Sequence, residues 1–151
     1  MKKKLIPLLI AVLIIGIVVW YFIPVPLLEN TERTWVAFID VRYGENHEEE
    51  ITLTPEHISS ELSDKIIAAL KDETYDRYSW LGKGRTPMAG DICLWIDGYP
   101  ESIYVIINPN NPEANFVQIG RMYHHLHNAE AIYEEVTAIL PDIETIAQIG
   151  E

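Results

Sequence analysis

Hydrophobic positions follow two different patterns along the chain. From residue 5 to residue 23 no position is charged and nearly all are aliphatic, whereas residues 2–4 are lysines and the next charge is Glu29. A helix rises about 1.5 Å per residue, so this run would span roughly 29 Å, close to a hydrocarbon core of about 30 Å. Pro24 should end the helix because proline lacks the donor that a continuing helix needs. The pattern predicts a transmembrane helix over residues 5–23.

The flanks of this run predict its orientation. Lysines favour the cytoplasmic side, so a cytoplasmic N-terminus (1–4) should precede a signal anchor in the cell membrane. A cleaved signal peptide is the alternative, but the run exceeds the usual apolar region of about 7–15 residues and no A-x-A-like site follows. We therefore expect a single-pass protein with three extracytoplasmic parts: a juxtamembrane linker (24–33), a domain (34–141) and a C-terminal tail (142–151).

Beyond the anchor, hydrophobic residues alternate with polar ones or recur at helical spacing. TWVAFIDVRY (34–43) and EEEITLT (48–54) alternate and are rich in β-branched and aromatic residues, which predicts two strands around a GENH turn. Thr54-Pro55-Glu56 is a typical helix start. An apolar stripe then predicts a helix that ends at about residues 71–74, with Ile58, Leu62, Ile66 and Leu70 on its buried side.

The second half of the domain continues with strands. DICLWID (91–97) and SIYVIIN (102–108) predict a strand pair, the first central in the sheet because both of its faces look apolar. ANFVQIGRMYHHLH (114–127) predicts one or two further strands with a break at Gly120. Asn128 should cap a second amphipathic helix. The order β-β-α-β-β-β-α predicts an α+β, two-layer domain with two helices on one face of a mainly antiparallel sheet.

The charge of the domain limits its partners. The whole chain has a formal net charge of −12, and without the three N-terminal lysines 8 basic residues remain against 23 acidic ones, a net charge of −15. Such a surface repels phosphate backbones, so we expect no nucleic acid partner. The single cysteine, Cys93, cannot form an internal disulfide. Its place inside DICLWID favours a buried apolar side chain over a reactive thiol.

Three of the five histidines fall within RMYHHLHNAE (121–130). On a strand, His125 and His127 share one face, and an H-x-H pair of this kind can supply two zinc ligands. A third ligand would have to come from Glu130, Glu134, His47 or His57. The alternative interpretation is a solvent-facing strand that carries amphipathic side chains.

The same segment carries a resemblance. The strand that ends at Asn128, followed by a helix with Ile132, Tyr133 and Val136, resembles the C-terminal part of many small bacterial membrane-anchored proteins of unknown function. The resemblance covers the general layout and the last thirty residues. It implies a signal anchor followed by one extracytoplasmic α+β domain, and it transfers no catalytic residue.

One irregular stretch, YDRYSWLGKGRTPMAG (75–90), is the other candidate site. It lacks the spacing of a phosphate-binding loop, so nucleotide binding is rejected. A loop with aromatic and cationic side chains would suit a peptide or protein partner. The candidate residues are Tyr78, Trp80, Lys83 and Arg85, although Tyr78 and Trp80 could instead fold inward over a sheet edge.

No recognised catalytic motif is present: the serines lie outside any nucleophile elbow, and Asp91 and Asp97 flank a strand without a catalytic spacing. We therefore expect a non-catalytic binding or protein-interaction module without a cofactor. It should contact the lipid bilayer through residues 5–23 and bind a peptide or protein with its exported domain. The alternative is a metal-binding or pH-sensing protein that uses His125 and His127.

Overall fold

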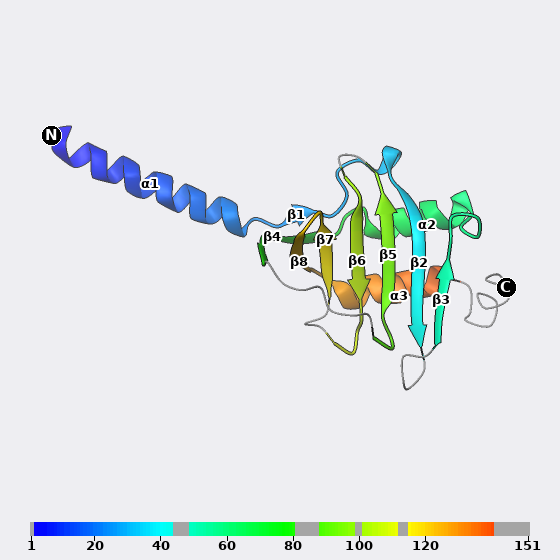
Figure 1. The fold of residues 1–151 in the computed structure, drawn as a ribbon. Coiled ribbons are helices and arrows are strands. Elements are labelled where there is room, and N and C mark those ends of the chain that lie inside the picture. Colours follow the sequence, from blue (N-terminus) through cyan, green and yellow to red (C-terminus); the bar gives the residue numbers. More distant parts are fainter. Residues whose placement is uncertain (1, 44–48, 81–87, 99–100, 112–114, 141–151) are drawn as a thin grey trace.

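The computed structural model describes residues 2–43, 49–80, 88–98, 101–111 and 115–140 (Figure 1). Over these residues the chain forms three α-helices, one short 3-10 helix and an eight-stranded sheet. The helices are α1 (Lys2–Phe22), η1 (Thr31–Arg33), α2 (Ser60–Leu70) and α3 (Ala129–Ile139). The strands are β1 (Val25–Pro26), β2 (Trp35–Tyr43), β3 (Glu49–Leu53), β4 (Thr74–Trp80), β5 (Ile92–Asp97), β6 (Ile103–Ile107), β7 (Phe116–Ile119) and β8 (Met122–Leu126).

The strands of the sheet pair antiparallel in the order β1-β4-β8-β7-β6-β5-β2-β3. Helices α2 and α3 lie against the same face of this sheet, while α1 projects away from the domain (Figure 1). The predicted α+β class and the mainly antiparallel sheet are therefore confirmed. The predicted strand pairs 34–43 with 48–54 and 91–97 with 102–108 are present as β2 with β3 and β5 with β6.

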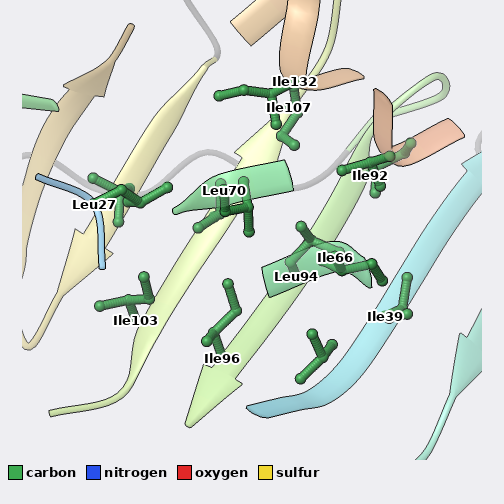
Figure 2. Packing of buried hydrophobic residues seen from close by; sticks show 14 of the residues in the cluster. Leu27, Ile39, Ile66, Leu70, Ile92, Leu94, Ile96, Ile103, Ile107 and Ile132 are labelled. Atoms are coloured by element: carbon green, nitrogen blue, oxygen red, sulfur yellow. The ribbon is translucent and has the colours of Figure 1, made fainter. Parts of the chain in front are cut away.

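The hydrophobic core fills the space between the two helices and the face that they cover. Ile66 and Leu70 of α2 and Ile132 of α3 point toward Leu94 and Ile107 of the sheet (Figure 2). Each fully buried aliphatic side chain of this kind contributes about 1.5–3 kcal/mol through the hydrophobic effect. The core therefore holds the covered face in place and leaves the opposite face free to carry other side chains.

Strand β5 shows how the sequence divides its side chains between the two faces. Leu94 is completely buried in the core, whereas its neighbour Trp95 is 43% exposed on the opposite face. Successive side chains of a strand point to opposite faces, so the alternation follows directly from strand geometry. The strand lies between β6 and β2 and is interior to the sheet, as predicted. Its two faces differ, however, because only one is covered by helices.

The stretch predicted to be irregular begins with a strand. Residues 74–80 form β4, which pairs with β8 through Tyr75 and Leu126 and with β1 through Tyr75 and Val25. The prediction of an irregular stretch was wrong for these residues. The charged residues Asp76 and Arg77 interrupt the apolar pattern from which a strand is recognised in a sequence. The pairing partners on both sides supply backbone hydrogen bonds that single-sequence propensity cannot reveal.

The segment expected to be a juxtamembrane linker, 24–33, contributes to the packing of the domain. It contains β1, and both Leu27 and Leu28 are buried in the hydrophobic core. The amide of Leu27 also donates to the carbonyl of Glu73, with an N–O distance of 2.7 Å. Because these two leucines are buried, the chain packs against the domain immediately after α1.

The start of the first domain helix differs from the prediction. Helix α2 begins at Ser60, and the side chain of Ser59 caps it by accepting a hydrogen bond from the Leu62 amide at 3.1 Å. The predicted cap, Thr54, instead closes a separate turn, in which its carbonyl accepts from the His57 amide at 2.8 Å. Its hydroxyl lies 3.0 Å from the His57 ring nitrogen Nδ1, so it is not available to cap a helix.

The predicted strand break and second helix are present, but the predicted cap is wrong. Gly120 has a φ of +58° between β7 and β8, a conformation that favours glycine. Asn128 precedes α3 with a φ of 52° and makes no capping hydrogen bond with its side chain. The left-handed backbone turns the chain from β8 into α3, and the capping geometry requires an extended backbone instead.

Within the described part of the chain, no helix is both long enough and apolar enough to cross a membrane. This finding gives no support to the membrane-spanning role predicted for residues 5–23, which stays a prediction.

Candidate functional site

Three large aromatic side chains are exposed on the face of the sheet that the helices do not cover. Trp35 is 54% exposed, Phe38 41% and Trp95 43%. Phe38 and Trp95 are direct partners across β2 and β5, and Trp95 is the partner of Tyr104 on β6. The rings of Trp95 and Tyr104 lie 5.8 Å apart. We call these four residues, Trp35, Phe38, Trp95 and Tyr104, the open aromatic face.

A bulge in β2 determines which aromatic side chains reach this face. The register between β2 and β5 shifts between Val36 and Phe38. Val36 and Ile39 are buried in the core, so the extra residue between them, Ala37, lets Phe38 point to the open side. Bulges of this kind redirect side chains, because they place two residues of one strand opposite one residue of its neighbour.

An acidic side chain holds the central tryptophan of the open aromatic face. The indole Nε1 of Trp95 donates to Asp97 Oδ1 at 3.0 Å, and the Ser102 hydroxyl donates to the same oxygen at 2.6 Å. Because one carboxylate accepts both bonds, the indole orientation is fixed while its ring face remains exposed. A fixed aromatic ring beside a negative charge is suited to contact with a cationic group.

A small second core lies beside these residues on the same face of the sheet. Cys93, Ile106 and Phe116 are buried together, with Tyr104 and Tyr123 packed against them. Burial raises the pKa of the Cys93 thiol to about 11, and the negative charges of Asp91 and Asp40 act in the same direction. The thiol is therefore protonated at neutral pH and is a poor nucleophile. Its predicted role as a buried apolar side chain is consistent with this environment.

One of the predicted partner-binding residues, Tyr78, lies on a strand and contacts α1. Tyr78 lies on β4, and its ring stacks on Tyr21 of α1 with the centroids 6.3 Å apart. The neighbouring Arg77 places its guanidinium 4.1 Å from the ring centroid of Trp20. These contacts join β4 to the end of α1. The side chain of Trp80 and both Lys83 and Arg85 lie outside the described residues, so their predicted role is untested.

The histidine cluster lies at the start of α3. The rings of His125 and His127 are 5.9 Å apart, and His127 Nε2 lies 2.8 Å from Asp76 Oδ1. Both histidines line an open pocket of about 290 Å³ together with Glu130. Among the described residues, no three His, Cys, Asp or Glu side chains are grouped so that they could hold a metal ion. His47 lies outside these residues, so zinc binding by the cluster stays a prediction.

The partner of His127 has a perturbed carboxyl group. Burial opposes the ionisation of Asp76, but hydrogen bonds from Tyr78 and His127 and the charges of His127 and His125 outweigh it. The pKa of Asp76 is therefore lowered from its ordinary value. This carboxylate connects β4 to His127 of the histidine cluster.

No protein-family model, curated protein or solved structure matches this chain. Its function must therefore follow from its own residues.

The open aromatic face was not predicted from the sequence. Both faces of 91–97 looked apolar, so nothing in the strand itself indicated that Trp95 would be exposed. The number of layers decides which apolar face remains exposed, and no pattern within a single strand contains that information. The bulge that exposes Phe38 had no sequence signal that we can identify.

Proposed function

We propose that this protein is a membrane-anchored, extracytoplasmic and non-catalytic module whose open aromatic face binds a cationic segment of a peptide or protein. The observation that supports this most strongly is the exposure of Trp35, Phe38 and Trp95 on the sheet face that the helices do not cover. Tryptophan and tyrosine are the residues most enriched where proteins bind one another, since they offer large contact areas at low cost in side-chain entropy. The face thus has the composition of a binding surface.

Charge favours a cationic partner. The chain without its N-terminal lysines has a net charge of −15, so it attracts positive segments and accelerates their encounter. On the open aromatic face, Asp97 lies directly beside the exposed Trp95 ring. An arginine or lysine side chain placed over an aromatic ring gains about 0.5–1 kcal/mol at an exposed site. Arg77 over Trp20 is an example of the same interaction within this chain.

The composition and exposure of α1 favour the membrane anchor. Its large apolar side chains from Ile6 to Phe22 are all between 43% and 67% exposed, and α1 projects from the domain (Figure 1). A helix that is apolar on every side requires an apolar environment, and the domain does not provide one. Residues 2–4, all lysine, favour a cytoplasmic N-terminus.

The contacts at the end of α1 would keep the domain close to the bilayer. Trp20 and Tyr21 contact β4, and β1 begins only a few residues later at Val25. Aromatic residues at this end of a membrane helix favour the interface between lipid and water. In the proposed arrangement the module therefore stands on the membrane surface rather than on a long flexible tether.

Titration of the full-length protein in zwitterionic lipid nanodiscs with a synthetic arginine–valine peptide tests the binding proposal. We expect the double variant Phe38→Ser/Trp95→Ser to bind about tenfold more weakly in calorimetry, because two ring contacts are lost. Met88→Ser is the matched control, since Met88 is an exposed apolar residue outside the strands. Equal affinity of the double variant and the wild type would reject the open aromatic face as the binding surface. Equal binding of a glutamate–valine peptide would reject the cationic partner.

A further inference from the structure

A second, separate feature is a pocket at the end of the core nearest β1. It has a volume of about 80 Å³, and its apolar wall is formed by Leu27, Leu28, Ile96, Ile103 and Ile119. Figure 2 shows Leu27 opposite Ile103 and Ile96 at this end of the sheet. These side chains belong to the covered face, so the pocket lies on the side opposite the open aromatic face. The pocket lies between Leu27 and Leu28, which follow β1, and residues of β5, β6 and β7.

At Gly98, the chain beside the pocket is packed too closely for a residue larger than glycine. Gly98 lines the pocket beside Thr34, and a Cβ atom on Gly98 would lie 2.7 Å from Thr34 Oγ1. Real Cβ atoms do not approach other atoms so closely, so this position requires glycine. The same Cβ atom would lie 3.0 Å from the Arg33 carbonyl oxygen, so the wall on this side is formed partly by backbone that approaches Gly98 closely.

The rim of the pocket is acidic. Glu29 and Glu101 line it, both are exposed, and the described lining residues include no basic side chain. Tyr75 also lines the pocket, and its pKa is raised first by burial and then by the charge of Glu29, with a smaller contribution from Glu101. The charge of Arg77 offsets only part of this rise. Both carboxylates thus act on the same rim, beside an apolar interior.

We propose that this pocket binds a primary ammonium group carried on a short apolar stem. A pocket needs about 10–15 Å³ to hold one water, so 80 Å³ has room for a chain of roughly four or five heavy atoms. The stem would contact Leu27, Ile103 and Ile119, and the ammonium group would remain at the rim beside the two carboxylates. Long cationic side chains divide in this way, with an apolar stem buried and a charged end in water. The same chemistry occurs in a lysine side chain of a peptide and in a free alkylamine.

The methyl resonances of the pocket provide the test. Full-length protein in zwitterionic nanodiscs, with isoleucine and leucine methyl groups labelled, is titrated with n-butylamine, with n-butanol and with N-acetyl-lysine methylamide. We expect n-butylamine to shift the methyl signals of Ile103, Ile119 and Leu28 in a saturable way. The affinity for n-butanol, measured from the same signals, should be at least about threefold lower. Saturation by the lysine derivative would assign the ligand to a peptide, and saturation by n-butylamine alone would assign it to a free amine.

Two matched double variants separate the rim charge from the total charge. In Glu29→Gln/Glu101→Gln the affinity for n-butylamine should fall about threefold or more. The control Glu134→Gln/Glu135→Gln removes the same charge from exposed positions of α3 and should leave this affinity unchanged. Equal affinity for amine and alcohol, equal affinity of both double variants, or no shift of the pocket methyl groups would each overturn the proposal. Because the open aromatic face is not altered, a failure here leaves the proposed function standing.

Discussion

Asn128 lies between β8 and α3 and has a left-handed backbone, with φ 52° and ψ 25°. Its side-chain Nδ2 donates to Glu73 Oε2 at 3.0 Å and so joins the start of α3 to the residue directly before β4. Asparagine tolerates the left-handed region better than most residues. Its value at this position is therefore conformational.

Substitutions at Asn128 distinguish the two roles. A left-handed position should accept Asn128→Gly almost without cost, whereas Asn128→Ser and Asn128→Ala should each lower the unfolding free energy by about 1 kcal/mol more than glycine does. A capping position would give a different order, since serine is among the best caps and alanine is poor. Urea denaturation of the three variants measures the order directly. Serine more stable than glycine would restore the capping role.

Asp76 provides a prediction of pH dependence. Its pKa is lowered in the folded state, so its ionised form contributes stability that is present above the ordinary aspartate pKa of about 3.9 and is lost as the pH falls through the folded value. In urea denaturation, wild type should therefore exceed Asp76→Asn in stability at pH 6, and the difference should shrink below about pH 4. Asp64→Asn, at an exposed position of α2, is the control and should show little pH-dependent difference. A difference for Asp76→Asn that grows on acidification would contradict the lowered pKa.

At the scale of elements, alternation and helical spacing predicted most of the domain. The strands β2, β3, β5 and β6 and the helix α3 were predicted from local patterns of apolar residues. Strand β4 was not predicted because it contains charged residues and is stabilised by pairing with β1 and β8, which lie far away in the sequence. The candidate site was largely missed for the same reason. Exposure of Trp95 depends on which face the helices cover, a property of the whole domain.

The division between the two faces of β5 can be measured. Leu94→Ala should lower the unfolding free energy by about 2–5 kcal/mol, because it leaves a cavity in the core beneath α2. Trp95→Ala on the same strand should cost less, since its side chain is nearly half exposed on the open aromatic face. Chemical denaturation of both variants tests this order. A loss below half a kcal/mol for Leu94→Ala, or a larger loss for Trp95→Ala, would show that the faces are assigned wrongly.

At the scale of the whole molecule, an apolar helix projects from a strongly acidic domain. The domain was predicted from its strand and helix patterns and the helix from its apolar run, and the contacts of Trp20 and Tyr21 with β4 could not be predicted from either. They depend on the position of an edge strand relative to the end of α1. These contacts orient α1 relative to the domain, which is the arrangement that the proposed surface-bound module requires.

The most direct test of the proposed anchored module is the location of its C-terminal end. Alkaline phosphatase, which is active only after export, is fused after Glu151 and expressed in bacterial cells, with a variant that lacks residues 5–23 as the control. The proposal predicts phosphatase activity and retention of the full-length fusion in the membrane fraction after alkaline carbonate washing. The control should lose both properties. A full-length fusion that is inactive and soluble in the cytosol would contradict the membrane anchor and the extracytoplasmic location together.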